Sequence, residues 1–164
     1  MEKTKLTMPN SYVKIDVHMV FHIKSGTQPI AAADTARLFS YIGGIVRSEG
    51  GMPVEIGGTG THVHALFSLP PTKSMSDFAR VLKSKSSRWL KDLGYTHFSW
   101  QEGYGAFSVS PSTMPKVVNY IRNQEEHHRR HTFKEECMMF FDAYRIPYDE
   151  KYLSPATPSG GSAG

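Results

Sequence analysis

The stretch Thr61-His62-Val63-His64-Ala65-Leu66-Phe67 places two histidines in an alternating apolar pattern that predicts a β-strand. Because successive strand side chains point to opposite faces, His62 and His64 project together from one face, while Val63 and every second residue after it face a core. Two neutral imidazoles on one rigid strand can chelate a metal ion. The alternative is a polar sheet face that carries two histidines without a ligand, and the rest of the chain has to decide between these interpretations.

The segment from Tyr12 to Ile23 alternates in the same way and predicts a second strand. Its apolar side consists of Val13, Ile15, Val17, Met19, Phe21 and Ile23. The opposite side is polar and includes His18 and His22. An exposed or edge position is the first expectation for these two histidines, and an approach to the His62 and His64 pair is the second.

The order of the elements indicates the fold. Residues 32–49 and 75–93 have the apolar spacing of amphipathic helices, and glycine follows each of them. A short strand at 54–56 and a turn at 57–60 precede the histidine strand, and a strand with glycine interruptions is expected over 98–110. The order β-α-β-β-α-β predicts an α+β fold of the ferredoxin-like, split βαβ type, with helices on one face of a central antiparallel sheet. The other face is expected to be open for chemistry.

Composition and charge limit the possible classes of protein. The chain of 164 residues predicts one domain over 12–153, between a flexible N-terminus (1–11) and a disordered tail (154–164) with the composition of an expression linker. It contains no apolar run of membrane-spanning length and no signal-peptide pattern, so we expect a cytoplasmic protein. The single cysteine, Cys137, excludes an intramolecular disulfide and thiolate zinc clusters. The net charge of +4 favours an anionic partner without requiring one.

The helix predicted over 75–93 is far more basic than solubility requires. Only Asp77 and Asp92 oppose its cations, which are Lys73, Arg80, Lys83, Lys85, Arg88 and Lys91. One interpretation is a solvated lysine-rich face, and the other is a surface that follows the phosphates of a nucleic acid.

A further helix is expected over 115–131, and on it Tyr120 and Gln124 share one face because they lie four residues apart. Alone, this pair fits a structural role. If the helix packs across the open end of the histidine strand, however, Gln124 offers an amide oxygen as a third metal ligand beside the phenol of Tyr120. A nearby cation favours the phenolate and would activate it to attack a phosphodiester. The proton acceptor stays open between water and a nearby histidine.

Four motifs, in this order, resemble the single-tyrosine HUH transposases of small bacterial insertion sequences, the IS200-like transposases, where U denotes the apolar residue between two histidines. The motifs are His62-Val63-His64, the helix segment 83–89, the strand segment 100–110 and the run Tyr120-Ile121-Arg122-Asn123-Gln124-Glu125-Glu126-His127-His128. The resemblance covers about 12–153. It implies that Tyr120 is the nucleophile that cleaves and rejoins single-stranded DNA through a 5′-phosphotyrosine link. It also implies that His62, His64 and Gln124 bind Mg²⁺ or Mn²⁺, and that helices at the C-terminal end carry the tyrosine.

The resemblance further implies partners for the chain. These are single-stranded DNA with hairpins at the ends of the element, and a second copy of the chain, whose histidine site the tyrosine helix completes in a homodimer. We assign DNA contacts to the basic residues Lys83, Lys85, Arg88 and Arg122. One departure is Thr61, where relatives often carry aspartate. Threonine removes a charge beside the metal and leaves the choice of metal open.

Two other functions compete with this one. A domesticated relative could bind DNA hairpins without mobilising anything, although an intact set of His62, His64, Tyr120 and Gln124 argues against it. A histidine-triad nucleotide hydrolase would need a further alternating histidine, where this chain has Leu66.

A second group of histidines lies at the end of the tyrosine helix. His127, His128 and His131 resemble a zinc cluster, but consecutive residues diverge by about 100° on a helix, so a solvated helix end is the preferred interpretation. The last predicted helix, over 132–144, begins with the capping-box pattern Thr132-Phe133-Lys134-Glu135.

Overall fold

The computed structural model of the protein describes residues 11–149. Almost all of the expected N-terminal segment 1–11 and the whole of the tail 154–164 therefore lie outside the described residues. The elements follow one another as β1 (Asp16–His22), α1 (Ala32–Ser48), β2 (Met52–Gly58), β3 (His62–Ser68), α2 (Met75–Leu93), β4 (Gly105–Val109), α3 (Met114–Arg122), α4 (Gln124–Arg130) and α5 (Phe133–Ala143).

The strands form one four-stranded sheet in the order β2-β3-β1-β4, and all neighbouring strands are antiparallel. Strands β1 and β3 therefore lie in the centre, where residue 18 pairs with residue 66 and residue 22 with residue 62. The α+β fold with a ferredoxin-like βαββαβ order is confirmed, as are the two amphipathic helices within it.

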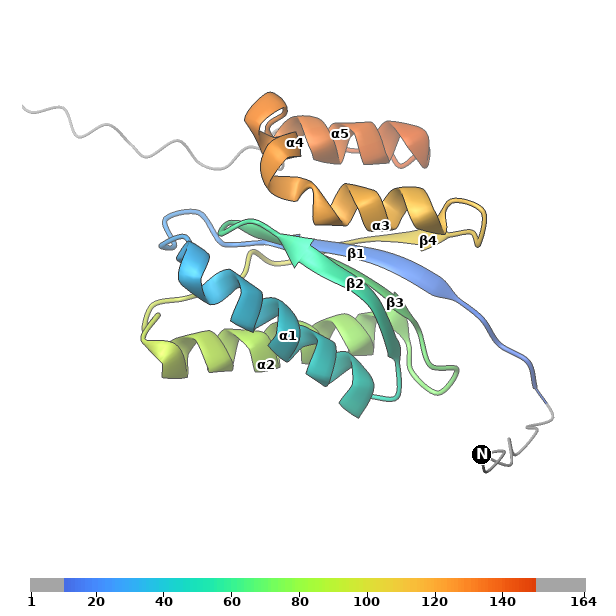
Figure 1. Ribbon diagram of the computed structural model, residues 1–164, viewed down its shortest axis with the longest axis horizontal. Coiled ribbons are helices and arrows are strands. Elements are labelled where there is room, and N and C mark those ends of the chain that lie inside the picture. Colours follow the sequence, from blue (N-terminus) through green and yellow to red (C-terminus); the bar gives the residue numbers. More distant parts are fainter. Residues whose placement is uncertain (1–10, 150–164) are drawn as a thin grey trace, which may run out of the picture.

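Helices cover both faces of the sheet (Figure 1), α1 and α2 on one side and α3, α4 and α5 on the other. The main core lies under α1 and α2 and includes Met19, Phe21, Leu38, Ile42, Val63, Ala65, Phe67, Phe78, Leu82 and Leu90. On the opposite side Leu66, Val109 and Ile121 form a smaller apolar cluster. The expectation of an open second face was wrong, because α3 to α5 bury the polar sides of β1 and β3 as well.

The helix ends follow from local sequence. The side chain of Ser74 accepts a hydrogen bond from the backbone N–H of Asp77 at the start of α2. Gly94 ends this helix with a φ of 121°, in the left-handed range that favours glycine. Thr132 and Glu135 form the expected capping box at the start of α5. No helix within residues 11–149 combines the length and apolar character required to cross a membrane.

Two predicted strands are shorter in the structure. β1 begins at Asp16, and residues 12–15 before it are exposed. The reason is that Asp16 pairs with the last residues of both neighbouring strands, Ser68 and Val109. Beyond it the backbone N–H of Leu69 still donates a hydrogen bond of 2.8 Å to the carbonyl of Ile15, but neither neighbouring strand extends further. The predicted strand 98–110 is reduced to β4 and one isolated bridge, Ile23 to Trp100.

The single helix expected over 115–131 is two helices. α3 ends at Arg122, Asn123 has a φ of −101° and a ψ of 24°, and α4 begins at Gln124. The chain bends there, so Tyr120 and Gln124 are not on one continuous helical face. They remain adjacent because the side-chain amide of Gln124 donates a hydrogen bond to the backbone carbonyl of Tyr120 at 3.2 Å.

Candidate active site

His62 and His64 lie on the face of β3 that α3 to α5 cover, and both are buried. Each imidazole is oriented through its Nδ1 atom. His62 Nδ1 lies 3.0 Å from the hydroxyl of Thr59 and 3.2 Å from that of Thr61, and His64 Nδ1 lies 2.7 Å from His18 Nε2. Hydrogen bonds at Nδ1 leave the two Nε2 atoms as the ligand positions of the pair.

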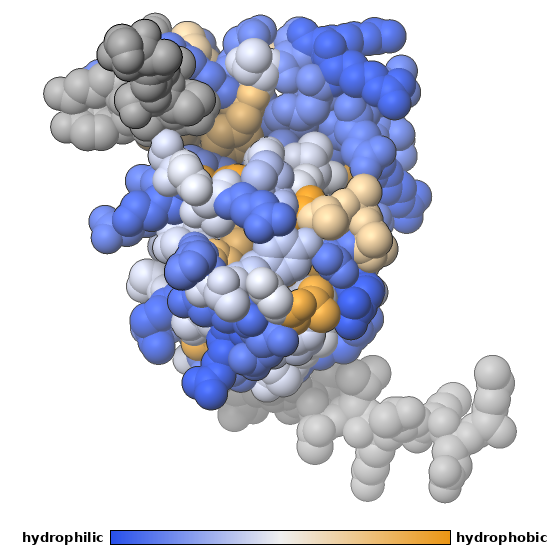
Figure 2. All heavy atoms as spheres, turned by 90° about the vertical axis from the view of Figure 1, so that its left-hand side faces the viewer, coloured by the Kyte–Doolittle hydropathy of each residue, from blue (hydrophilic) through white to orange (hydrophobic). Residues whose placement is uncertain are grey.

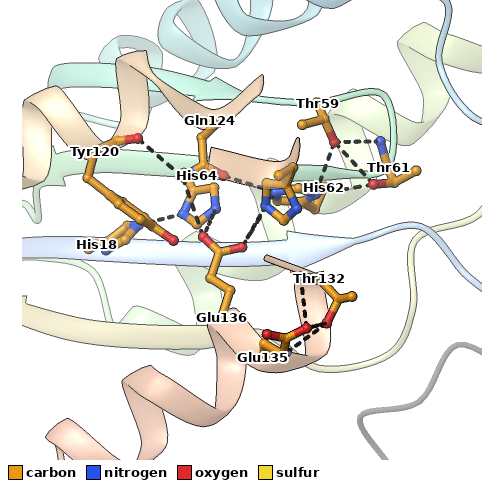
Figure 3. A network of polar contacts seen from close by, with 11 residues as sticks. His18, Thr59, Thr61, His62, His64, Tyr120, Gln124, Thr132, Glu135 and Glu136 are labelled. Atoms are coloured by element: carbon orange, nitrogen blue, oxygen red, sulfur yellow. Dashed lines mark hydrogen bonds and ion pairs between the residues drawn. The ribbon is translucent and has the colours of Figure 1, made fainter. Parts of the chain in front are cut away.

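The two Nε2 atoms converge on one carboxylate, that of Glu136 (Figure 3). Glu136 Oε1 lies 3.0 Å from His64 Nε2, and Oε2 lies 3.8 Å from His62 Nε2. Gln124 completes the group, because its Oε1 lies 3.1 Å from His62 Nε2 and its amide nitrogen 3.4 Å from Glu136 Oε1. The contact between His64 and Glu136 is not aligned as a hydrogen bond, so His64 Nε2 is buried without a hydrogen-bond partner among the described residues.

Glu136 is the member of this candidate metal-binding group that the sequence did not predict. It comes from the first turns of α5 and is only 2% exposed. A signal for it was available in the spacing of the helix, since Glu136 interrupts the apolar stripe of Phe133, Cys137, Phe140, Phe141 and Tyr144. A carboxylate at a core position of an amphipathic helix requires a polar partner inside the protein.

Tyr120 lies at the C-terminal part of α3, with its ring against the histidine cluster. Its ring centroid is 5.5 Å from that of His64, 6.2 Å from His18 and 5.0 Å from His127. The phenol oxygen is buried and has no hydrogen-bond partner in the described part of the chain. The tertiary structure therefore brings together all four residues that the resemblance singles out.

Two histidines for which the sequence predicts exposed positions, His18 and His128, contact residues of the candidate site. His18 is 2% exposed, because β1 is a central strand and its polar side is covered. His128 is also drawn inward, and its Nε2 lies 2.8 Å from Glu136 Oε2. The expectation of an exposed or edge position for His18, and of a solvated helix end for His128, was wrong. His22 is half-buried against the ring of Phe133 at 4.8 Å.

Burial controls the protonation of this cluster. It lowers the pKa of His62 to about 2 and that of His64 to about 3, because desolvation disfavours the imidazolium form and neighbouring histidines add repulsion. Burial raises the pKa of Glu136 to about 8. At neutral pH both imidazoles are therefore neutral, which is the charge state that metal ligation requires.

These residues fit a divalent cation. Two imidazole nitrogens, one carboxylate and one amide oxygen are a donor set that Mg²⁺, Mn²⁺ and other divalent ions accept. A cation would also pair with the unpartnered His64 Nε2 and with the buried charge of ionised Glu136. The described residues thus contain a group of His62, His64 and Glu136 whose ligand atoms all lie within 4.8 Å of one another.

The basic residues that we assign to DNA lie apart from this group. The Lys83 ammonium donates to the backbone carbonyls of Gln101 and Gly103, Lys85 pairs with Glu49, and Arg122 pairs with Glu55. Lys85 and Arg88 are exposed on α2, across the sheet from the histidines (Figure 1). Their contact with DNA remains a prediction.

Stability of the metal-free protein should depend on pH through Glu136. The unfolded carboxyl has a pKa near 4.5 and the folded one a pKa of about 8, so the stability contribution is complete below pH 4.5 and is lost as pH rises to 8. The total is on the order of 5 kcal/mol. Glu136→Gln should remove this loss, so that its free energy of unfolding exceeds that of the parent increasingly between pH 5 and 8.

Urea denaturation with a chelator present at pH 5 and pH 8 measures this difference. His62 and His64 are common to both proteins and cancel in the comparison. Glu125→Gln, at an exposed position of α4, is the control and should follow the parent. Parallel pH profiles for the parent and Glu136→Gln would contradict the raised pKa.

Comparison with known proteins shows the family of the chain. The profile of the family "Transposase IS200 like" matches residues 11–124. The ISDra2 transposase TnpA of Deinococcus radiodurans is 23% identical over 120 residues, which span 69% of this chain and 86% of that protein. The transposase for insertion sequence element IS200 of Salmonella typhimurium is 36% identical over 72 residues, 40% of this chain and 47% of that protein.

Solved structures show the same fold. A protein of Deinococcus radiodurans solved as a candidate transposase has a TM-score of 0.57 at 22% identity and covers 71% of this chain and 95% of its own. A REP-associated tyrosine transposase bound to a REP hairpin has a TM-score of 0.56 at 15% identity, with 74% and 73% covered. The family match includes His62, His64, Tyr120 and Gln124 but ends before Glu136. With more than two thirds of its length matched by the family profile, the chain belongs to the IS200-like transposase family.

Proposed function

We propose that the protein cleaves and rejoins single-stranded DNA at the ends of an insertion sequence, with Tyr120 as the nucleophile. The observation that carries this proposal is the buried phenol oxygen of Tyr120, which has no hydrogen-bond partner within residues 11–149 and lies beside a cluster of His62, His64 and Glu136. A nucleophile and a metal-binding group side by side are the two components that phosphodiester transfer needs.

The proposed cofactor is Mg²⁺ or Mn²⁺, held by His62 Nε2, His64 Nε2, the carboxylate of Glu136 and the amide oxygen of Gln124. When bound, the ion supplies stabilisation of the negative charge that develops on the phosphate oxygens. Glu136 adds one negative charge to an otherwise neutral ligand set and offsets the charge absent at Thr61. The site then retains a net positive charge, which attracts a phosphodiester.

In the proposed reaction the phenol oxygen of Tyr120 attacks phosphorus, and the bond to the 3′-oxygen breaks. The products are a 5′-phosphotyrosine and a strand with a free 3′-hydroxyl. A base or water takes the phenol proton, and the leaving 3′-oxygen takes up a proton from the same base or from water. The imidazole rings of His18, His64 and His127 lie against the Tyr120 ring, and burial lowers the pKa of all three, so neutral bases surround the nucleophile. Because the tyrosyl link retains the energy of the phosphodiester bond, a 3′-hydroxyl can reverse the step and join a new strand.

We place the DNA strand in a groove along α3 and α4 that borders Tyr120. Its volume is about 490 Å³, and it is lined by Lys116, Asn119, Tyr120, Asn123, Glu126, His127, Arg130 and His131. Cationic and amide side chains of this kind bind phosphates and position the strand without reading its sequence. The REP hairpin bound by the structural relative supports hairpin DNA as the partner of this chain too.

A homodimer is part of the proposal. The resemblance implies that the tyrosine helix of one copy serves the histidines of the other. In the described chain Tyr120 already lies 5.5 Å, between ring centroids, from its own His64, which supports a site that one chain can also assemble alone.

The test is to trap and orient the covalent intermediate. A hairpin strand labelled at either end is incubated with the protein and Mg²⁺ or Mn²⁺, then denatured in detergent. We expect the label on the 3′ side of the cut to stay with the protein, on a peptide that contains Tyr120, and the label on the 5′ side to be released with a 3′-hydroxyl. The opposite polarity, or an adduct on another residue, would refute the mechanism. Hairpin binding without an adduct under any metal condition would instead indicate a hairpin-binding protein that mobilises nothing.

A further inference from the structure

A second concavity lies on the other side of the cluster, between α5 and the sheet. Its volume is about 300 Å³, and its lining combines β1, β4, the loop before β4 and one side of α5. Glu136 belongs both to this lining and to the group with His62 and His64. The cavity and the proposed metal site therefore share one side chain.

The walls of the cavity are largely aromatic. Phe107 of β4 stacks on Phe140 of α5, with ring centroids 4.9 Å apart and planes at 19°. Phe133 lines the cavity from the start of α5, and Tyr104 stands in the loop before β4 with 41% of its surface exposed. On the face shown in Figure 2, hydrophilic side chains predominate and hydrophobic ones appear only in small areas between them. The cavity thus gathers aromatic rings from β4, from the loop before it and from α5.

The loop before β4 is held in place. Lys83 donates hydrogen bonds of 2.7 Å to the carbonyls of both Gln101 and Gly103, and the backbone N–H of Gln101 donates to the carbonyl of His22 at 2.8 Å. Gly103 has a φ of +83°, which glycine adopts without strain. Hydrogen bonds to α2 and β1 therefore hold the loop that contains Tyr104.

We propose that this cavity binds one unpaired nucleobase of the DNA strand whose phosphate lies at the metal site. The proposal rests on the proposed function and names the element of the strand that the site recognises beyond its backbone. Each nucleotide carries its base and its phosphate on one sugar. A metal site for the phosphate and an adjacent cavity for the base can therefore hold one nucleotide, or the phosphate of one nucleotide and the base of the next. Aromatic side chains stack on any base, and cavities of this size and mostly apolar lining are typical of small planar ligands.

The polar groups that line the cavity indicate which part of the nucleotide it binds. Glu102 and Gln101 line the cavity, and Glu136, whose carboxylate we assign to the metal site, borders both. Carboxylates repel a phosphate but accept hydrogen bonds from the exocyclic amino group of a base. The cavity is accordingly suited to adenine, cytosine or guanine, and less to thymine, which has no amino group.

The test replaces single bases of a hairpin strand with the fluorescent base 2-aminopurine, on both sides of the cut, in the Tyr120→Phe protein, which leaves the strand intact. We expect quenching at one position, and about tenfold weaker binding when that nucleotide is abasic. Tyr104→Ala should remove the quenching. This variant should also bind the abasic strand and the intact strand with equal affinity. Tyr104→Phe keeps the ring and should restore both effects. Tyr12→Ala, an exposed tyrosine elsewhere, should behave as the parent.

The result separates this inference from the proposed function. Quenching that is equal in Tyr104→Ala and the parent, or a bound strand with no quenched position, would overturn the nucleobase cavity even if wild-type protein forms the Tyr120 adduct. Conversely, position-specific quenching that depends on Tyr104 would support the cavity even if no adduct forms. Circular dichroism of each variant confirms that the fold is retained.

Discussion

Replacement of Tyr120 with phenylalanine is expected to abolish the covalent protein–DNA adduct while leaving the fold and hairpin binding intact. The phenol oxygen is the proposed nucleophile, and without it no phosphotyrosine can form. The change is nearly isosteric, so the ring contacts with His64 and His127 stay. Because that oxygen is buried without a hydrogen-bond partner among the described residues, its removal costs no hydrogen bond. Gel electrophoresis under denaturing conditions measures the adduct, and thermal unfolding measures the stability.

A matched control is available in the same region. Tyr144→Phe removes a phenol whose hydroxyl donates a 2.8 Å hydrogen bond to the carbonyl of Ser108. It should lower stability by at most about 1 kcal/mol and leave adduct formation unchanged. An adduct that persists in Tyr120→Phe would exclude Tyr120 as the nucleophile, whatever the behaviour of Tyr144→Phe.

His64→Ala is expected to have the second largest effect, the loss of metal-dependent stabilisation and of strand cleavage. His64 is fully buried, and its Nε2 faces Glu136 while its Nδ1 contacts His18. A metal ligand that is worth several kcal/mol in the transition state corresponds to a fall in the cleavage rate of about a thousandfold or more. In the parent, Mn²⁺ at a hundred times its dissociation constant should raise the free energy of unfolding by about 2.7 kcal/mol, and in His64→Ala this increase should vanish.

The substitution also removes packing, so its effect on metal binding has to be separated from its effect on the fold. Paramagnetic resonance of Mn²⁺ counts bound ions directly and is applied to protein that circular dichroism shows to be folded. His97→Ala, a change of the same type far from the site in sequence, should leave Mn²⁺ binding unchanged. Full Mn²⁺ affinity in folded His64→Ala would place the metal elsewhere.

The same measurement decides between the two oxygen ligands. Glu136→Gln keeps the shape of the side chain and removes its charge, and Gln124→Ala removes the amide that lies 3.1 Å from His62. If both groups bind the ion, each variant should weaken Mn²⁺ binding by at least about tenfold, a loss of 1.4 kcal/mol. An unchanged affinity in one of them identifies the other as the third ligand.

The local patterns determined much of the fold. Alternation placed His62 and His64 on one face of a strand opposite Val63, and the capping box marked the start of α5, because both effects depend only on neighbours in the chain. The strand limits were less predictable. The apolar alternation begins at Tyr12, but β1 begins only at Asp16. The start of β1 depends on where the neighbouring strands β3 and β4 end, and the local pattern does not contain this information.

The candidate site, like the fold, is predictable from the sequence in part, and in part only from the tertiary structure. The sequence by itself determined which residues are the candidates, the histidine pair, the tyrosine and the glutamine, because the motifs that contain them resemble those of the IS200-like transposases in kind and in order. Only the tertiary structure decided that α5 closes over the sheet and brings Glu136 to His64, from 72 residues away, at 3.0 Å. It also decided that His18 supports His64 from the neighbouring strand. Such contacts arise from the packing of distant elements, and the burial they produce is what raises the pKa of Glu136 and lowers those of the histidines.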